Sequence, residues 1–492
     1  MRDYPEKPRD ECGVVGIICN TDAAKGGLSA EEQARINTRA SVSAYHALYA
    51  LQHRGQNSAG IAVSNGSVIR NVKGAGLAPD VFTMKTLSEL SGYMAIGHVR
   101  YAGHKTAAEI NAQPFLIETM GEQIALAFNG ALVNSEQLRR VIEHRGGIFQ
   151  TASDAEVILN TIVYERLHTR TLEDAVLRAA KQFQGAFSIL LMTKSKMIAL
   201  RDPFGFRPLC VGRNVDGLVI ASESCALDAV EASFGRDIRP GEMVVVEAGR
   251  LSSYQASIPE RGALCAFEFI YMARPDSVID GQPVETSRNL AGRYLAKSSP
   301  ADADIVIGVP DSGMSAALGY AQESGIPYAI GFIKNRYIGR TFIQDTQGMR
   351  ESSLKIKLNV LKPVVDGKRV VMVDDSIVRG TTIHRVVRLL REAGATEVHM
   401  RVASPKYEHP CYFGTDVLTR DQLMATRYNA EELVRRIDVD SLGFLRQEDL
   451  PNVMPDLKVG WCDACFTGEY PIPIVAEKER NKNGRQKDER IV

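Results

Sequence analysis

The segment RVVMVDDSIVRGTTIHRVV combines acidic, basic and hydroxyl side chains at the end of an apolar run. Such a run predicts a buried strand of a parallel sheet, and ligands of these sheets bind beyond the carboxyl ends of the strands. A glycine and two hydroxyls before a helix offer N–H donors and a favourable dipole to a phosphate, and paired carboxylates can hold sugar hydroxyls or hydrated magnesium. A capped helix preceded by solvated acids is the alternative. The residues concerned are Asp374, Asp375, Arg379, Gly380, Thr381 and Thr382.

A second candidate for chemistry is Cys12, which precedes Gly-Val-Val-Gly near the start of the chain. Free cysteine is among the most buried residue types, so a core position in a first strand is its commoner role. A nucleophile is the alternative, and it would need a base because an unperturbed thiol is mostly protonated near neutral pH. Taken alone, Cys12 favours the core position.

The third candidate is the C-x-x-C pair Cys462 and Cys465 in WCDACF, which fits a zinc site, an iron–sulfur site or redox chemistry. Eight cysteines in 492 residues do not make a disulfide framework. Cys19, Cys210 and Cys225 stand in apolar, strand-like segments, so we expect them in the core.

The composition excludes several classes of protein. A chain of 492 residues is long enough for two large domains. Its 59 basic and 59 acidic residues cancel, which argues against a surface that neutralises a nucleic-acid backbone. No run of eighteen apolar residues could span a bilayer, and MRDYPEKPRDE lacks the apolar core of a secretory signal. We therefore expect a cytoplasmic protein that binds neither nucleic acid nor membrane.

Two patterns of secondary structure divide the chain. Residues 12–250 contain many short strands, such as SAGIAVS and AFSILLMT, and few helices, which predicts a layered α+β sandwich. From 265 to 475 the runs ADIVIGVP, PYAIGFI, KRVVMVDD and EVHMRVAS are continuously apolar, and amphipathic helices such as TIHRVVRLLREAG lie between them. This second pattern predicts a doubly wound α/β domain, followed by a charged, disordered tail at 476–492.

Three segments of the second part resemble type I phosphoribosyltransferases. VVMVDDSIVRGTT is similar to their phosphoribosyl pyrophosphate (PRPP) signature, VPDSGMSAA to their pyrophosphate loop, and KNRYIGRTFIQ to the flexible loop that closes over the substrate. Basic residues in such a loop can neutralise departing pyrophosphate. The resemblance implies that PRPP is bound by Asp311, Ser312, Lys334, Arg336, Arg340, Asp374, Asp375, Arg379, Gly380, Thr381 and Thr382, and one Mg²⁺ by Ser312, Asp374 and Asp375.

The start of the chain resembles the class II glutamine amidotransferases, which are N-terminal nucleophile enzymes. Both parts together, from Cys12 to about Pro473, resemble the glutamine PRPP amidotransferases. The resemblance implies an αββα N-terminal nucleophile domain followed by an α/β type I phosphoribosyltransferase domain. It implies that glutamine is hydrolysed at Cys12 and that ammonia passes to C1 of PRPP, in the first committed step of purine synthesis. It further implies that residues 1–11 are a propeptide, whose removal frees the Cys12 amine to act as the base.

The same resemblance assigns the glutamine site. Arg100 in HVRY would bind the α-carboxylate of glutamine and Asp154 in SDAE its α-ammonium group, while Arg54 in LQHRGQNSAGI would be mainly architectural. Asn129 and Gly130 in FNG would form the oxyanion hole. Two positions of this site depart from the family pattern: Ala102-Gly103 stands where a serine or threonine pair is usual, and Phe128 stands where histidine is common.

An iron–sulfur branch of the family, of the Bacillus type, holds one 4Fe–4S cluster per subunit on four cysteines. The matching positions are Cys265, Cys411, Cys462 and Cys465. The chemistry of four thiolates would equally suit structural zinc.

The resemblance also implies a dry passage for ammonia between two sites, with Phe267 and Tyr271 as candidate lining residues; ordinary packing between domains would explain them equally well. It implies feedback inhibition by purine nucleotides and a homo-oligomer, a dimer or a tetramer. The alternatives are a purine-responsive PRPP-binding regulator and a different class II amidotransferase. The neutral charge balance argues against the first, and the Asp374–Asp375 loop argues against the second.

Overall fold

The structure is a computed structural model that describes residues 12–20, 30–101, 109–256, 261–335, 358–378, 380, 383–415, 417 and 419–474. The expected propeptide and the charged tail lie outside these ranges. Seven residues singled out above also lie outside these ranges: Ala102, Gly103, Arg336, Arg340, Arg379, Thr381 and Thr382.

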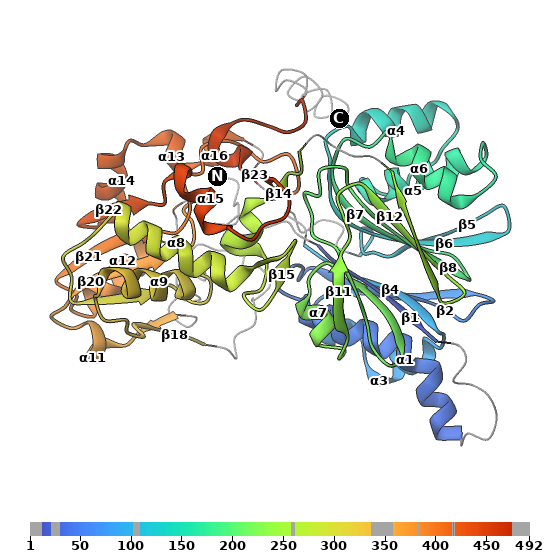
Figure 1. The fold of residues 1–492 in the computed structure, drawn as a ribbon, viewed down its shortest axis with the longest axis horizontal. Helices are drawn as coiled ribbons and strands as arrows, with labels where there is room; N and C mark the ends of the chain where they lie inside the picture. The colour runs from blue at the N-terminus through green and yellow to red at the C-terminus, as the bar shows by residue number, and fades with distance from the viewer. Residues whose placement is uncertain are drawn as a thin grey trace, which may run out of the picture.

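The N-terminal lobe, blue to green in Figure 1, contains two large antiparallel sheets. The seven-stranded sheet has the order β11 (Ser233–Asp237), β9 (Cys210–Arg213), β10 (Gly217–Ala221), β1 (Gly13–Cys19), β4 (Met94–Arg100), β2 (Ser58–Ser64) and β3 (Ile69–Ala75). The six-stranded sheet has the order β13 (Arg250–Gln255), β12 (Glu242–Glu247), β8 (Lys196–Arg201), β7 (Gly185–Met192), β6 (Glu122–Leu132) and β5 (Phe115–Thr119).

The two sheets pack face to face. Successive side chains of a strand point to opposite faces of its sheet, and in these strands both sets are apolar. On β1, Val14 and Ile18 pack with Ala127 of the other sheet, whereas Val15 and Ile17 point to the opposite face. Helices cover both outer faces, which confirms the predicted αββα sandwich. They are α1 (Ala30–Ala50), α2 (Ala78–Val81), α3 (Met84–Glu89) and α7 (Cys225–Asp228) on the seven-stranded sheet, and α4 (Ser135–His144), α5 (Asp154–Arg166) and α6 (Leu172–Ala180) on the other.

The C-terminal lobe, yellow to red in Figure 1, is built on a parallel sheet. Its order is β17 (Ile305–Gly308), β20 (Arg369–Asp374), β21 (Glu397–Val402) and β22 (Ser441–Phe444). Val371 and Val373 of β20 pack towards α8 (Val284–Ser298) and α9 (Met314–Ser324). Val370 and Met372 pack towards α12 (Ile383–Glu392) and α14 (Ala430–Ile437) on the other face, so the doubly wound α/β prediction is confirmed.

One predicted strand of this sheet is wrong. In PYAIGFI only Tyr328 forms a parallel bridge, to Val306, and the run does not continue along β17. The chain leaves the sheet at Gly331, where an added Cβ atom would lie 2.7 Å from the Ile307 side chain. The residues that follow form β18 (Phe332–Lys334), which pairs antiparallel with β19 (Leu358–Val360) outside the main sheet.

Short elements fill the region where the lobes meet (Figure 1). β14 (Leu264–Cys265) pairs in parallel with β23 (Trp461–Cys462), and a π-helix, η2 (Glu268–Met272), follows β14. The short elements not yet named, several of which lie elsewhere in the C-terminal lobe, are β15 (Val278–Ile279), β16 (Gln282–Pro283), α11 (Lys362–Val365), η3 (Arg420–Gln422), α13 (Met424–Arg427), η4 (Gln447–Asp449), α15 (Leu450–Val453) and α16 (Ala464–Thr467). No helix in the described ranges is long and apolar enough to cross a membrane.

Candidate functional site

Cys12 stands half-buried immediately before β1, where the two sheets of the sandwich approach each other. Its backbone N–H donates to Oδ1 of Asn129, 3.2 Å away on β6 of the opposite sheet. Its carbonyl oxygen accepts a hydrogen bond of 3.1 Å from Nε of Arg54. The backbone of Cys12 is therefore held on both sides, so the position of its thiol is set by the two sheets and by Arg54.

Asn129 and Gly130 lie in consecutive positions of β6. Asn129 is buried, and its Nδ2 has no hydrogen-bond partner among the residues that the structure describes. A buried donor without a partner costs about 1–3 kcal/mol, so such a group is expected to meet a ligand or a water. At Gly130 φ is 140°, and an added Cβ atom would lie 2.0 Å from the carbonyl oxygen of Ala186, so the close approach of β7 requires glycine.

Phe128 and His98 stabilise β6 from two sides. The Phe128 ring packs in the outer core with α5, on the face opposite to Asn129, so this departure from the family pattern falls on a packing position. The backbone carbonyl of Phe128 lies 3.0 Å from Nε2 of His98. Burial lowers the pKa of His98 to about 3, so the imidazole is neutral near neutral pH.

Arg100 ends the strand next to β1, and Asp154 is the first residue of α5. The Asp154 carboxylate accepts from the Leu132 N–H at 2.8 Å and from the Ser135 hydroxyl at 2.5 Å, at the end of β6. Burial raises its pKa, although these hydrogen bonds oppose the effect. Arg100 is the last residue of β4, the neighbour of β1, and is half-buried.

Arg54, predicted to be mainly architectural, lies at the centre of a buried network of charged side chains. Its buried guanidinium donates to Glu223 at 2.6 Å and makes two hydrogen bonds of 3.0 Å each to Glu268. Burial alone would lower the pKa of Arg54, but the two carboxylates raise it above its usual value. Burial would raise the pKa of Glu223, yet His53, at 2.7 Å, and Arg54 hold it below its usual value. These groups form a charged network directly under Cys12.

Glu223 and Glu268 were missed by the sequence analysis. Each lies more than 160 positions along the chain from Arg54, with separations of 169 and 214 residues. For Glu268 a signal exists: it is a lone carboxylate inside the apolar run FEFIYM, and a charge in such a run needs a buried partner.

The predicted PRPP residues that the structure describes gather at the carboxyl ends of β17 and β20. Asp374 and Asp375 are buried, and the Ser312 hydroxyl donates to the Asp375 carboxylate. Lys334 forms an ion pair with Asp311. Gly380 has a φ of 73°, which a glycine tolerates best. Oxygen ligands thus meet at the sheet edge where open α/β sheets bind ligands.

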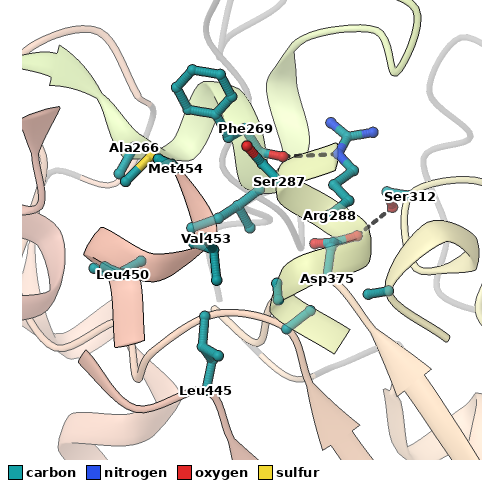
Figure 2. Close-up of a pocket in the computed structure, with 14 residues that line it drawn as sticks. Ala266, Phe269, Ser287, Arg288, Ser312, Asp375, Leu445, Leu450, Val453 and Met454 are labelled. Carbon is teal, nitrogen blue, oxygen red and sulfur yellow. Dashed lines mark hydrogen bonds between the residues drawn. The ribbon is translucent and has the colours of Figure 1, made fainter. Parts of the chain in front are cut away.

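A cavity lies next to Asp375 (Figure 2). Asp375, Ser312 and Arg288 line one side of it, and Arg288 comes from α8. The opposite side is apolar and includes Leu445 and Val453.

All four predicted cluster ligands line a second cavity, between the lobes. They come from separate segments: the β14–β23 pairing sets Cys265 beside Cys462, Cys465 lies in α16, and Cys411 lies in a loop. Burial raises the pKa of the Cys265 and Cys462 thiols to about 12. Within the described ranges, no three or more His, Cys, Asp or Glu side chains are arranged to hold a single metal ion.

The three remaining cysteines, Cys19, Cys210 and Cys225, are buried in the core, as expected from their apolar surroundings.

Comparison with known proteins covers both lobes. A family model described as "Glutamine amidotransferase domain" matches residues 98–229, and one described as "Phosphoribosyl transferase domain" matches residues 285–409. The amidophosphoribosyltransferase of Methanocaldococcus jannaschii is 45% identical over 95% of this chain and 99% of its own length. That of Bacillus subtilis is 45% identical over 94% of this chain and 95% of its own.

A solved structure agrees with the sequence relatives. Glutamine PRPP amidotransferase from B. subtilis, complexed with ADP and GMP, superposes with a TM-score of 0.85 at 44% identity, and the match covers 95% of this chain and 98% of that one. Both the fold and the sequence match are therefore continuous across the two lobes. This chain belongs to the amidophosphoribosyltransferase family.

Proposed function

We propose that the two lobes carry out two half-reactions, glutamine hydrolysis at Cys12 and amination of PRPP at the Asp374–Asp375 edge. In the first, the Cys12 sulfur attacks the side-chain carbonyl carbon of glutamine. The carbon–nitrogen bond breaks, and ammonia leaves with the proton that the thiol has lost. Water then attacks the thioester, which releases glutamate and restores the thiol. The products of this lobe are glutamate and ammonia.

The base in this proposal is the α-amine of Cys12. Such an amine has a pKa of about 8, which suits proton exchange with the thiol and with departing ammonia. The nitrogen is an amide as long as residues 1–11 are attached, so the proposal includes their removal between Glu11 and Cys12.

The observation that carries the proposal is the buried Nδ2 donor of Asn129 beside Cys12. When a thiolate attacks the amide carbon, negative charge develops on the amide oxygen, and a preorganised N–H donor stabilises it. Asn129 and the backbone N–H of Gly130 would supply this oxyanion hole. Arg100 and Asp154, at the ends of β4 and β6, would bind the α-carboxylate and the α-ammonium group of glutamine.

This role predicts the effect of Asn129→Ala. Loss of one oxyanion donor should lower glutamine hydrolysis by about 10²–10³-fold, measured as glutamate release in the presence of PRPP. Asn134→Ala is the matched control, because Asn134 is also a buried amide near the end of β6. Its Nδ2 donates to the Gln182 carbonyl and its Oδ1 accepts from the Gln184 N–H, so both of its polar groups already have partners. Equal losses in the two variants would contradict the oxyanion role.

In the second half-reaction, ammonia attacks C1 of PRPP, the bond from C1 to the pyrophosphate oxygen breaks, and 5-phosphoribosylamine forms with inversion. Asp311, Ser312, Lys334, Asp374 and Asp375 would bind PRPP together with Gly380, and so would Arg336, Arg340, Arg379, Thr381 and Thr382, which lie outside the described residues. The carboxylates and the Ser312 hydroxyl offer the hard oxygen ligands that suit Mg²⁺, which when bound would offset charge on the leaving pyrophosphate.

We also propose a 4Fe–4S cluster held by Cys265, Cys411, Cys462 and Cys465. The observation in its favour is that all four cysteines line one cavity. Four thiols from separate segments around one cavity fit this group, and a cluster there would tie the C-terminal segment to the region between the lobes. The proposed role of the cluster is structural, since neither half-reaction proposed above uses it.

Cluster binding predicts that protein purified without oxygen contains about four iron atoms and four acid-labile sulfides per chain. Cys465→Ser should lose this iron and unfold more readily, while Cys210→Ala, at a core cysteine away from the cavity, should keep it. Zinc without iron in the wild-type protein would contradict the cluster.

Three further features belong to the proposal. Phe267 directly precedes η2 and Tyr271 lies within it, and their ring centroids are 6.2 Å apart. Both are candidates to line a dry passage for ammonia. Purine nucleotides are proposed as feedback inhibitors, in line with the ADP and GMP bound to the B. subtilis enzyme. We further propose that the protein forms a homo-oligomer, a dimer or a tetramer, in the cytoplasm. The cytoplasm is reducing, so cysteine thiolates remain available as ligands there.

A further inference from the structure

Glu268 is a buried carboxylate of the C-terminal lobe that reaches into the glutamine site. Its side chain is fully buried, and both of its oxygens bind the Arg54 guanidinium at 3.0 Å. A second buried arginine, Arg207, lies 3.4 Å from the same carboxylate. The carboxylate is thus fixed between two guanidinium groups, and it cannot move without uncovering a buried charge.

The contact with Arg54 leads directly to Cys12. Arg54 donates through Nε to the Cys12 carbonyl, while its two terminal nitrogens are directed at Glu223 and Glu268. The guanidinium is planar and rigid, so the two carboxylates determine where its Nε–H points. Glu223 is provided by the N-terminal lobe and Glu268 by the C-terminal lobe, so the position of Cys12 depends on both.

Glu268 is also the first residue of the π-helix η2, a rare type of turn that is common at functional sites. Arg288 of α8 holds this helix from the other side: Nε donates to the Phe269 carbonyl at 2.8 Å and Nη2 to the Ala273 carbonyl at 2.7 Å. Figure 2 shows Arg288 beside Asp375 at the edge of the cavity described above. Arg288, which lines this cavity together with Asp375, therefore also holds the short helix that begins at Glu268.

We propose that Glu268 is a positioning residue for glutamine hydrolysis, which acts by orienting Arg54 against the Cys12 carbonyl. The proposal rests on the proposed role of Cys12 as nucleophile.

The test compares Glu268→Gln with wild-type enzyme in three measurements: glutamate release with and without PRPP, PRPP amination from ammonium salt, and thermal unfolding. Gln keeps the shape of Glu but removes the charge and turns an N–H group towards Arg54. We expect hydrolysis with PRPP to fall roughly tenfold to a hundredfold, as for a small misplacement of a reacting group. Amination from ammonium should stay within about twofold, and Glu268→Asp should recover part of the hydrolysis.

Asp280→Asn is the matched control. Asp280 makes a buried, two-pronged pair with Arg201 at 2.6 and 3.0 Å, between the same two lobes, and these contacts do not include Arg54. It should lower the unfolding temperature as Glu268→Gln does, yet keep the ratio of glutamine-dependent to ammonium-dependent activity.

Two outcomes would overturn the inference. One is an equal fall of glutamine-dependent and ammonium-dependent activity in both Glu268 variants, which would indicate a structural role only. The other is normal hydrolysis in Glu268→Gln. A wild-type protein that releases no glutamate would instead contradict the proposed function itself.

Discussion

Replacing Cys12 by alanine is expected to abolish synthesis of 5-phosphoribosylamine from glutamine while synthesis from ammonium salt continues. The loss should be on the order of 10⁴-fold or more, as for removal of the nucleophile in other acyl-transfer enzymes. The reason is that the alanine variant lacks the only group in this site proposed to form the thioester, whereas the PRPP carboxylates lie in the other lobe. Glutamate and pyrophosphate release measure the two activities separately.

Cys19→Ala is the control, because Cys19 ends the same strand, β1, and is buried in the core. It should cost stability without a selective effect on glutamine. A Cys12→Ala enzyme that still releases glutamate in the presence of PRPP would remove the basis of the proposed mechanism.

Replacing Asp375 by asparagine is expected to lower PRPP amination by about 10²–10³-fold with either nitrogen source, since a bound cation stabilises the transition state by several kcal/mol. Asp375 is buried at the end of β20 and holds the hydroxyls of Ser312 and Ser376. Its loss therefore removes charge from the proposed magnesium site and loosens the pyrophosphate loop. Pyrophosphate release, titrated against magnesium, measures both effects.

The matched control is Asp302→Asn, which removes an exposed carboxylate paired with Arg369 at the opposite end of β20. Exposed ion pairs contribute little, so this variant should behave as wild type. Unchanged pyrophosphate release in Asp375→Asn would contradict the placement of PRPP at this sheet edge.

Periodicity and local chemistry predicted most of the fold. Short apolar runs identified strands such as β2 and β7, because one face of each lies between the sheets and the other lies under the covering helices. In α12 the predicted apolar face is the one that the structure buries, with Gly394 after its end at a φ of 101°. A continuous apolar run marked β20, since both of its faces are covered.

The errors come from contacts that local sequence does not encode. PYAIGFI has the composition of a buried strand, but only Tyr328 bridges to β17, and Phe332–Lys334 pair with β19 outside the sheet. Glu223 and Glu268 were missed as partners of Arg54 because they lie 169 and 214 residues from it along the chain, one of them in the other lobe. Burial of charge depends on such distant partners, so neither propensity nor spacing could place this network.

The central claim is that one chain moves ammonia from the Cys12 site to the PRPP site without release to solvent. The most direct test supplies glutamine labelled with ¹⁵N in its side-chain amide, together with PRPP, in buffer that contains unlabelled ammonium at a concentration at which ammonium alone gives negligible product. Direct transfer predicts that the 5-phosphoribosylamine captured as it forms carries ¹⁵N and that glutamate and pyrophosphate appear in equal amounts. Product that carries mainly unlabelled nitrogen would contradict the account.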